Sequence, residues 1–305
     1  MLRAGLLYLS EQPSVFRFVR RNAIARRLAS RFVAGETLDE AARAVRELNA
    51  GGISASLDLL GESVRTAEEA RAAADTAVQM LERIAADRLD ANISVKLTQF
   101  GLDLDPALCA ANARRLLARA RALDIFVRVD MESSAYTRQT LDLVERQLFP
   151  DFPKHTGVVI QSYLYRSADD VRRLIGLGMR VRLCKGAYKE HETVAWTAMD
   201  DIRKSFRENV RVLLAGGNHP AIATHDESLV QDALAVSRES GIAPARFEFQ
   251  MLYGLRPRRW DELVAAGYNV RIYVPFGTHW MPYFYRRLRE RRENVLFVLK
   301  GLLGG

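Results

Sequence analysis

The chain has 305 residues, of which 49% are hydrophobic and 27% are charged, and this balance is typical of a soluble globular protein with a sizeable core. It contains no apolar run as long as the roughly 18 residues that a membrane-spanning helix needs, and its first residues turn polar too soon for a secretory signal, so we expect a cytoplasmic protein. The net charge of +8 suits nucleic acid, an anionic membrane surface or an anionic small molecule, but a solvated basic surface explains it equally well.

Two helices are expected at the N-terminal end. Between residues 14 and 34, large apolar side chains recur on one face and arginines lie between them, which predicts a basic amphipathic helix. This helix either packs on the rest of the protein or makes a salt-sensitive contact with anionic lipid. The sequence from Thr37 to Glu40 has the form of a capping box and predicts a second helix that runs to Asn49.

Eight short β-like runs follow, with helical patterns between them. The runs lie at 53–59, 93–97, 125–131, 158–163, 181–184, 221–224, 247–251 and 270–274. The clearest helical segments lie at 66–86, 106–122, 168–177, 228–240 and 260–266. Eight strands that alternate with helices predict a parallel (β/α)8 barrel, and an open doubly wound sheet is the alternative. We expect residues 1–50 to form a helical segment packed on the barrel, and residues 51–305 to form the barrel as a single structural domain.

The strands alternate apolar side chains with a mixed set that includes charged ones. Successive side chains of a strand point to opposite faces, so we expect the apolar set to pack on the outer helices and the mixed set to face the barrel axis. Functional sites of such barrels lie at the C-terminal ends of the strands. Four polar residues of the mixed set fall near strand ends and are the first site candidates: Lys96, Asp130, Gln161 and Arg182.

Lys96 and Asp130 belong to neighbouring strands and are predicted to pair. A purely structural ion pair is the simpler interpretation, but burying a charge pair is costly unless further partners satisfy it, so a pair at the rim favours an anion-binding site. After the fifth strand, Lys185 and Gly186 offer a second such site, because glycine lets backbone amides approach an anion. An ordinary strand-to-helix turn is the alternative there.

The histidines and cysteines indicate no metal site. No pair among the 5 histidines has the spacing of a metal-binding motif, so we interpret His225, beside Thr224 at the end of the sixth strand, as a hydrogen-bonding or stacking residue. Cys109 and Cys184 are expected to be free thiols, and a single disulfide between them is the alternative. No Gly-x-Gly-x-x-Gly fingerprint follows a strand, which argues against a Rossmann nucleotide site.

The C-terminal segment carries a candidate carboxylate clamp. Tyr283, Arg286 and Arg287 lie at helical spacing, and arginine binds carboxylates in a bidentate manner that lysine cannot match. A solvated basic face is the alternative. Glu62 follows the first strand, which neighbours the eighth strand in a closed barrel. We hypothesise a Glu62–Arg286 ion pair that acts as a gate over the bound ligand, and a rim salt bridge without a kinetic role is the alternative.

Seven motifs, in the order in which they occur, resemble those of proline dehydrogenases, and more narrowly of the short, monofunctional bacterial type. They are Ser94-Val-Lys-Leu-Thr-Gln, Val129-Asp-Met-Glu, Ile160-Gln-Ser-Tyr-Leu-Tyr, Arg182-Leu-Cys-Lys-Gly-Ala-Tyr, Ala223-Thr-His, Phe247-Glu-Phe-Gln-Met-Leu-Tyr-Gly, and Arg271-Ile-Tyr-Val-Pro-Phe-Gly with Tyr283-Phe-Tyr-Arg-Arg. The resemblance implies a distorted barrel whose last helix sits over the mouth, and noncovalently bound FAD. It also implies oxidation of L-proline to Δ1-pyrroline-5-carboxylate, with electrons passed to a membrane quinone.

The resemblance further implies a role for each matching residue. Asp130 and Arg182 would be catalytic, with Arg182 beside the reactive nitrogen of the flavin. The residues that would bind proline are Lys96, Leu183, Tyr188, Tyr273, Tyr283, Arg286 and Arg287. The residues that would bind FAD are Met131, Gln161, Arg182, Lys185, Gly186, Ala187, Thr224 and His225. Cys184 and Lys189 stand where relatives often carry valine and tryptophan.

Two other classes of function remain open from the residues alone. A Schiff-base aldolase could use Lys96 or Lys185 as its covalent lysine. A non-enzymatic nucleic-acid binder would suit the positive charge, but it leaves the inward polar residues without a purpose. The family resemblance favours neither of these classes, and we expect no nucleic-acid partner. We hypothesise that the basic helix at residues 14–34 makes a peripheral contact with anionic lipid on the inner face of the cell membrane, because the quinone that the resemblance implies as electron acceptor is lipid-soluble.

Overall fold

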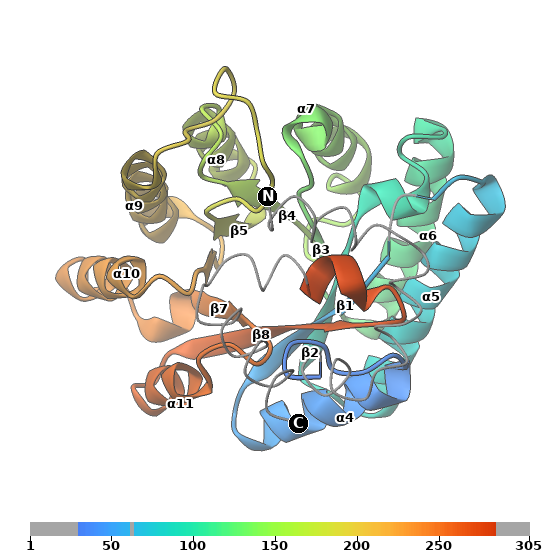
Figure 1. Cartoon of the computed structure of the whole chain (residues 1–305), viewed down its shortest axis with the longest axis horizontal. Coiled ribbons are helices and arrows are strands. Elements are labelled where there is room, and N and C mark those ends of the chain that lie inside the picture. Colours follow the sequence, from blue (N-terminus) through green and yellow to red (C-terminus); the bar gives the residue numbers. More distant parts are fainter. Residues whose placement is uncertain (1–29, 62–63, 285–305) are drawn as a thin grey trace, which may run out of the picture.

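The structure is a computed structural model, and it describes residues 30–61 and 64–284. Eight parallel strands close into a barrel in which each strand pairs with the next along the chain and β8 pairs with β1. Helices surround the barrel on its outside (Figure 1). The predicted barrel is therefore confirmed, and the open doubly wound sheet is excluded because the two end strands are hydrogen-bonded to each other.

Each predicted strand is present, with shifted ends. The strands are β1 (Ser54–Leu59), β2 (Ala91–Val95), β3 (Val127–Val129), β4 (Thr156–Gln161), β5 (Arg180–Cys184), β6 (Ala221–Ala223), β7 (Glu248–Leu252) and β8 (Asn269–Phe276). β3 is shorter than predicted by two residues at each end. β8 is longer than predicted and pairs with β1 over the whole length of β1.

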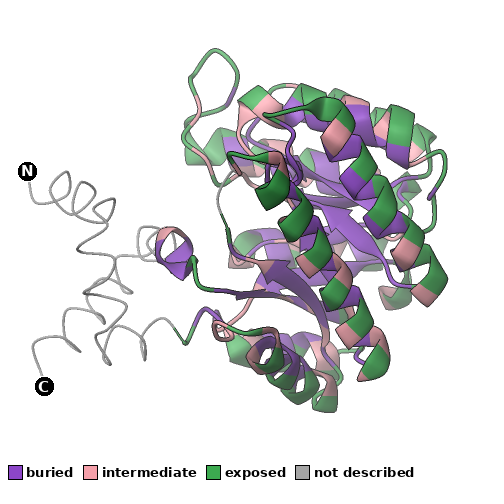
Figure 2. Cartoon of the chain, turned by 90° about the vertical axis from the view of Figure 1, so that its right-hand side faces the viewer, coloured by how far each residue is buried: buried purple, intermediate pink, exposed green. Residues whose placement is uncertain are grey.

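The helices alternate with the strands as predicted. They are α4 (Leu38–Ala50), α5 (Ala67–Ala86), α6 (Pro106–Leu123), α7 (Ser134–Leu143), α8 (Ser167–Gly176), α9 (Met199–Gly216), α10 (Glu227–Glu239) and α11 (Pro257–Ala265). Their inner faces are buried against the strands and their outer faces are exposed (Figure 2). Among the described residues, no helix is sufficiently long and apolar to cross a membrane.

The N-terminal part of the described chain packs on the barrel. α4 begins with the predicted capping box, in which Thr37 Oγ1 accepts from the backbone N–H of Glu40 and the Glu40 carboxylate accepts from that of Thr37. Its buried side chains join one core with β1 and β8. Residues 30–34 form a turn and a bend, so the predicted helical end at residue 34 is wrong. The rest of that predicted basic helix lies outside the described residues.

The interior of the barrel is polar, as the alternation in the strands predicted. Ser56 and Ser94 meet at 3.0 Å between their hydroxyl oxygens. Arg128 is fully buried, and its Nη1 donates to the backbone carbonyls of Val158 and Arg180. Such an interior is unusual for a barrel core, which is more often filled by branched apolar side chains. Polar side chains inside the barrel can donate and accept hydrogen bonds, so they can stabilise charged groups at the C-terminal ends of the strands.

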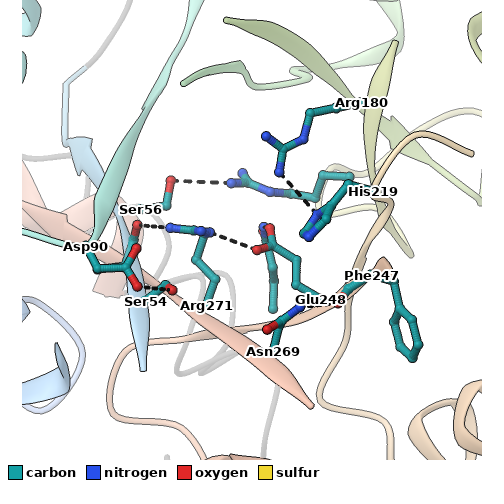
Figure 3. A network of polar contacts seen from close by, with 12 residues as sticks. Ser54, Ser56, Asp90, Arg180, His219, Phe247, Glu248, Asn269 and Arg271 are labelled. Atoms are coloured by element: carbon teal, nitrogen blue, oxygen red, sulfur yellow. Dashed lines mark hydrogen bonds and ion pairs between the residues drawn. The ribbon is translucent and has the colours of Figure 1, made fainter. Parts of the chain in front are cut away.

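A second polar network lies toward the opposite end of the barrel (Figure 3). Arg271 Nε donates to Glu248 at 3.0 Å, and Arg180 Nη2 lies 3.1 Å from His219 Nδ1. Burial raises the pKa of Glu248, but Arg271 and then Arg128 outweigh burial and lower it to about 2. Burial also lowers the pKa of His219. The ring of His219 is therefore neutral near pH 7 and accepts from Arg180.

This arrangement predicts how stability responds to acid. A histidine in the unfolded chain has a pKa of about 6.5, and the folded value of His219 is lower, so the unfolded chain binds an extra proton between the two values. The stability from neutral His219 is complete above about pH 6.5 and is lost as the pH falls through the folded pKa. We expect His219→Asn to show a smaller fall in unfolding free energy between pH 7.5 and 5.5 than wild type, by ~1 kcal/mol or less in urea titrations.

Asparagine suits this position because His219 has φ of +45°, which asparagine tolerates better than most residues. His191→Asn is the matched control, since His191 is exposed and its partner, Thr193, lies two residues along the same loop. This control should keep the pH dependence of wild type. An identical slope in His219→Asn and wild type would contradict the assignment.

Candidate active site

A cavity of about 680 Å³ lies at the C-terminal ends of the strands. Its lining comes from residues at the ends of most of the strands and from the loops that follow them, so its position agrees with the rule for functional sites in such barrels. The volume falls within the roughly 300–1,000 Å³ of small-molecule and cofactor sites. Most of the predicted site residues in the described part of the chain line this cavity: Lys96, Asp130, Met131, Gln161, Arg182, Lys185, Gly186, Ala187, Tyr188, Thr224, His225, Tyr273 and Tyr283.

Lys96 pairs with a residue that the sequence interpretation did not consider. Its Nζ lies 2.6 Å from Oδ1 of Asp58, the penultimate residue of β1, and the side chain of Asp58 is only 2% exposed. The predicted Lys96–Asp130 pair is therefore wrong. The two side chains share the cavity, but Asp130 has other partners. Burial acts to lower the pKa of Lys96, and the carboxylates of Asp58 and Asp130 outweigh burial and raise it.

Asp130 is held by two groups at once. Arg182 Nη1 donates to its Oδ1 at 2.8 Å, and the Tyr273 hydroxyl donates to its Oδ2 at 2.7 Å. Burial, followed by the nearby carboxylates of Asp130 and Asp58, raises the pKa of Tyr273 well above its usual value, so the phenol stays a donor. Both oxygens of the Asp130 carboxylate are thus fixed between strands β5 and β8.

Arg182 is the centre of the cavity floor. Its side chain is 6% exposed and reaches from the middle of β5 across the barrel. Its Nη2 donates to Ser94 at 3.1 Å and to Ser56 at 3.4 Å, and its guanidinium lies 5.3 Å from the centre of the Tyr273 ring. Arg182 Nε is buried and has no hydrogen-bond partner among the residues that the structure describes. A buried donor of this kind needs a partner, which a bound group could supply.

The loop after β5 forms the wall of the cavity beside Arg182. Gly186 has φ of +124°, and a Cβ at this position would lie 2.5 Å from the Tyr163 ring, so no other residue fits without rearrangement. Gln161 Oε1 accepts from the backbone N–H of Ala187 at 3.3 Å. Lys185 Nζ lies 3.2 Å from Asp226, which also accepts from Arg203. Burial raises the pKa of Asp226, but hydrogen bonds from Arg203 and Ser228 and the charge of Lys185 lower it overall.

His225 and Thr224 lie where β6 ends. The Nε2 of His225 accepts from the backbone N–H of Leu252, which fixes the ring by a hydrogen bond to β7. Thr224 Oγ1 accepts from the backbone N–H of Asp226 at 3.1 Å. The prediction that His225 is a hydrogen-bonding residue is confirmed. Cys109 and Cys184 are both free thiols, as predicted.

The sequence profile of the proline dehydrogenase family matches residues 41–300. This chain belongs to the proline dehydrogenase family. It is 41% identical over 304 residues to proline dehydrogenase 1 of Bacillus subtilis strain 168, covering 99% of each chain. It is 38% identical over 309 residues to the proline dehydrogenase of Deinococcus radiodurans, covering 100% of this chain and 99% of the relative.

Solved structures of larger proteins of this family share the fold. Proline utilization A of Bdellovibrio bacteriovorus, inactivated by N-propargylglycine, superposes with a TM-score of 0.81 at 25% identity, over 87% of this chain and 32% of that one. A mutant of the Bradyrhizobium japonicum protein gives 0.75 at 26% identity, over 91% of this chain and 32% of that one. The chain thus spans about a third of those proteins, and it is an oxidoreductase of proline catabolism.

Some residues predicted for this proline dehydrogenase site lie elsewhere or outside the described chain. Leu183 is fully buried in the hydrophobic core, because its neighbours on β5, Arg182 and Cys184, take the two inward positions. The structure does not bring Leu183 to the cavity. Glu62, Arg286 and Arg287 lie outside the described residues, so the carboxylate clamp and the gate stay predictions. Residues 280–284 are helical and place Tyr283 in the cavity lining.

The sequence interpretation missed Asp58, which lines the cavity of this proline dehydrogenase site, and Glu132, whose carboxylate lies within electrostatic range of Lys96. Asp58 carried a usable signal, because Ser54, Ser56 and Asp58 alternate with apolar residues along β1 and so form its inward set. Glu132 accepts from the Thr98 hydroxyl at 2.7 Å and links the ends of β2 and β3. Glu132 follows the end of β3, where side chains no longer alternate between two faces, so the sequence did not predict where its side chain points.

Proposed function

We propose that this enzyme oxidises L-proline to Δ1-pyrroline-5-carboxylate with noncovalently bound FAD, and that a membrane quinone accepts the electrons. The observation that carries the proposal is the cluster of Lys96, Asp130 and Arg182 on the floor of the cavity, next to the loop at Gly186. The cluster supplies cations for a small carboxylate, and the loop supplies a close backbone approach for a large anionic cofactor.

The residues present fit FAD. Gly186 leaves backbone where any side chain would collide with Tyr163, and Lys185 lies beside it for a pyrophosphate. The unpartnered Nε of Arg182 is a donor aimed at no described residue, and Met131 and Gln161 line the same cavity. Arg182, Met131 and Gln161 would hold the ring system, Lys185, Gly186 and Ala187 the phosphates and ribityl chain, and Thr224 and His225 the adenosine. When bound, FAD supplies the acceptor for the hydride.

The chain's own residues orient proline. Lys96, together with Arg286 and Arg287 as predicted from the sequence, would hold the carboxylate, and Tyr273, Tyr188 and Tyr283 would pack on the ring. Clamping one end of a small rigid ring fixes the carbon beside its nitrogen, which is the geometry that hydride transfer needs. Asp130 is a positioning residue for this site, since it fixes Arg182 and the Tyr273 hydroxyl.

The amine of proline must lose its proton before the carbon–hydrogen bond breaks. We expect the rate to rise with pH over the alkaline range, because the neutral amine is the reactive form. Tyr273 keeps its proton in this range, since its pKa is raised by burial and by nearby carboxylates. The pH profile should therefore report the substrate amine rather than this phenol.

Contact with the membrane and the gate belong to the same proposal. The acceptor is lipid-soluble, the net charge is +8 and the sequence before residue 30 is rich in arginine, so a cytoplasmic enzyme that touches anionic lipid on the inner face of the cell membrane is favoured. Flotation with anionic vesicles at low salt measures that contact, and absence of binding contradicts it.

Glu62 and Arg286 are proposed to form the ion pair that gates the site, and residues 1–50 are proposed to form a segment that packs on the barrel.

The visible spectrum of the purified protein tests the proposed function. We expect flavin absorbance that bleaches on addition of L-proline under anaerobic conditions and returns on addition of a soluble quinone. A Schiff-base aldolase would instead be colourless and would be trapped by borohydride with a carbonyl substrate. A flavin spectrum that L-proline leaves unchanged would contradict the assignment of the substrate.

A further inference from the structure

We propose that Asp58 is a positioning residue that keeps Lys96 protonated at the alkaline pH where the amine of proline loses its proton. The inference rests on the proposed function, because it assigns Lys96 to the substrate carboxylate. It adds a residue that neither the motifs nor the predicted carboxylate clamp contain. Asp58 would act through Lys96 and not on proline itself.

The geometry of the pair comes from the register of β1 and β2. Asp58 lies opposite Ser94 in the ladder between these strands, and Lys96 follows two residues later with its backbone still extended. The side chains of Ser94 and Lys96 therefore point to the same face, toward the barrel axis. Lys96 Nζ meets Asp58 Oδ1 at 2.6 Å, which fixes one of the three ammonium protons.

The Asp58–Lys96 pair allows two amines to hold opposite protonation states at the same pH: neutral for proline and charged for Lys96. A neutral amine requires alkaline pH, whereas a lysine that binds a carboxylate must stay charged. Lys96 is largely buried, with 17% of its side chain exposed, and burial by itself favours the neutral amine of lysine. Asp58 is almost fully buried beside it, so a negative charge in direct contact offsets the cost of burying the ammonium.

Other titratable groups also face Lys96. Asp130, after β3, and Tyr188, in the loop after β5, both act on its pKa, and Glu132 lies within electrostatic range. Tyr273, on β8, donates to Asp130. All four remain in place when Asp58 alone is changed, so a difference between that variant and wild type isolates the contribution of Asp58.

The test uses a ligand that has no amine proton. Tetrahydrofuran-2-carboxylate has the ring size and carboxylate of proline, but an oxygen replaces the nitrogen, so its ionisation does not change between pH 7.5 and 10. Calorimetric titration of the holoenzyme then contains no ionisation of the ligand, and a contribution from the bound flavin is common to wild type and the variants. We expect the dissociation constant of wild type to stay level as the pH rises, because Lys96 remains charged.

Asp58→Asn keeps the shape of the side chain and removes its charge. Once the pH exceeds the new pKa of Lys96 in this variant, we expect the dissociation constant of the analogue to rise by up to about tenfold per pH unit. The affinity should level off about 10- to 100-fold below that of wild type, which is the contribution of one charged hydrogen bond. The ratio of the KM for proline in Asp58→Asn to that in wild type should follow the same curve, because the ionisation of the substrate amine cancels in the ratio. Asp90→Asn is the matched control at the other end of β1, where Asp90 accepts from Ser54, and it should behave as wild type.

Further variants and outcomes complete the test. Lys96→Arg added to Asp58→Asn should restore the level curve, because arginine does not deprotonate in this range. Asp58→Ala replaces Asp58→Asn if the latter does not fold. Curves for the Asp58 variant and wild type that stay parallel from pH 7.5 to 10 would overturn the role of Asp58 alone. A wild-type enzyme that neither binds the analogue nor is reduced by proline would overturn the proposed function, and this inference with it.

Discussion

Arg182→Met is expected to slow reduction of the bound flavin by proline at least about a hundredfold, measured by stopped-flow absorbance. The guanidinium is the central cation of the cavity floor, and a preorganised donor aimed at a site of developing charge typically contributes two to three orders of magnitude to the rate. Methionine fills a similar volume but cannot donate. The variant would also leave the Tyr273 hydroxyl as the sole donor to Asp130 among the contacts described for that carboxylate.

A stability measurement separates the effect of Arg182→Met on flavin reduction from its effect on the buried ion pair with Asp130. Removing one partner of a buried ion pair costs about 3–5 kcal/mol, so we expect the urea midpoint to fall as well. Arg180→Met is the matched control, because Arg180 lies on the same strand toward the opposite end and contacts His219. This control should lose some stability and reduce its flavin at the wild-type rate. Reduction within about threefold of wild type in folded, flavin-loaded Arg182→Met would refute the assignment.

Gly186→Ala is expected to weaken FAD binding at least about tenfold, so that the protein purifies with little flavin. A Cβ at this position lies within 2.7 Å of three atoms of the Tyr163 ring, and φ of +124° is strained for any other residue. The loop must therefore move away from the cavity wall or displace the ring. The flavin content of the purified protein and a fluorescence titration with FAD measure the effect.

Gly178→Ala is a control that shares the positive φ without the collision. Gly178 has φ of +72°, lies before β5 as Gly186 lies after it, and has no atom within 4 Å of a Cβ placed on it. This change should cost roughly 1–2 kcal/mol of stability through the left-handed backbone and leave FAD binding unchanged. Equal FAD affinity in Gly186→Ala and wild type would show that the loop does not hold the cofactor.

The fold could be predicted from the sequence because its signals are local. Alternation of side chains marks each strand, and caps such as the Thr37–Glu40 box mark where helices begin. The ends of strands were predicted less well, as at β3, which covers only Val127–Val129 although buried apolar residues lie on both sides of it, at Ile125 and at Met131. The predicted helix over residues 14–34 was also wrong at its C-terminal end. Phe32 and Val33 are apolar and buried, as a helix face would be, but they lie in a turn that packs on Trp280 and Phe284.

The sequence predicted which residues face the cavity, but not which of them form ion pairs with one another. Alternation indicates which residues face the axis, and this was correct for Lys96, Asp130 and Arg182. It does not indicate how far a long side chain reaches. Arg182 extends from β5 past β4 to Asp130, whereas Lys96, after β2, pairs with Asp58 on the neighbouring strand β1 and not with Asp130 after the neighbouring strand β3. Leu183 shows the opposite error, since alternation alone would have placed it in the core.

Closure of the barrel by β1 and β8 has a consequence for how the enzyme is made. These strands pair although the chain between them is long, and the bond from Arg271 to the carbonyl of Ala55 spans 216 residues. During synthesis, one edge of β1 has no partner until β8 has left the ribosome, and such an edge can pair with other chains. Tyr273 arrives with β8, so Asp130 receives its hydrogen bond from Tyr273 only after Arg182 of β5 has been made. We therefore expect slow closure, dependence on chaperones at high expression, and cofactor uptake only after translation has ended.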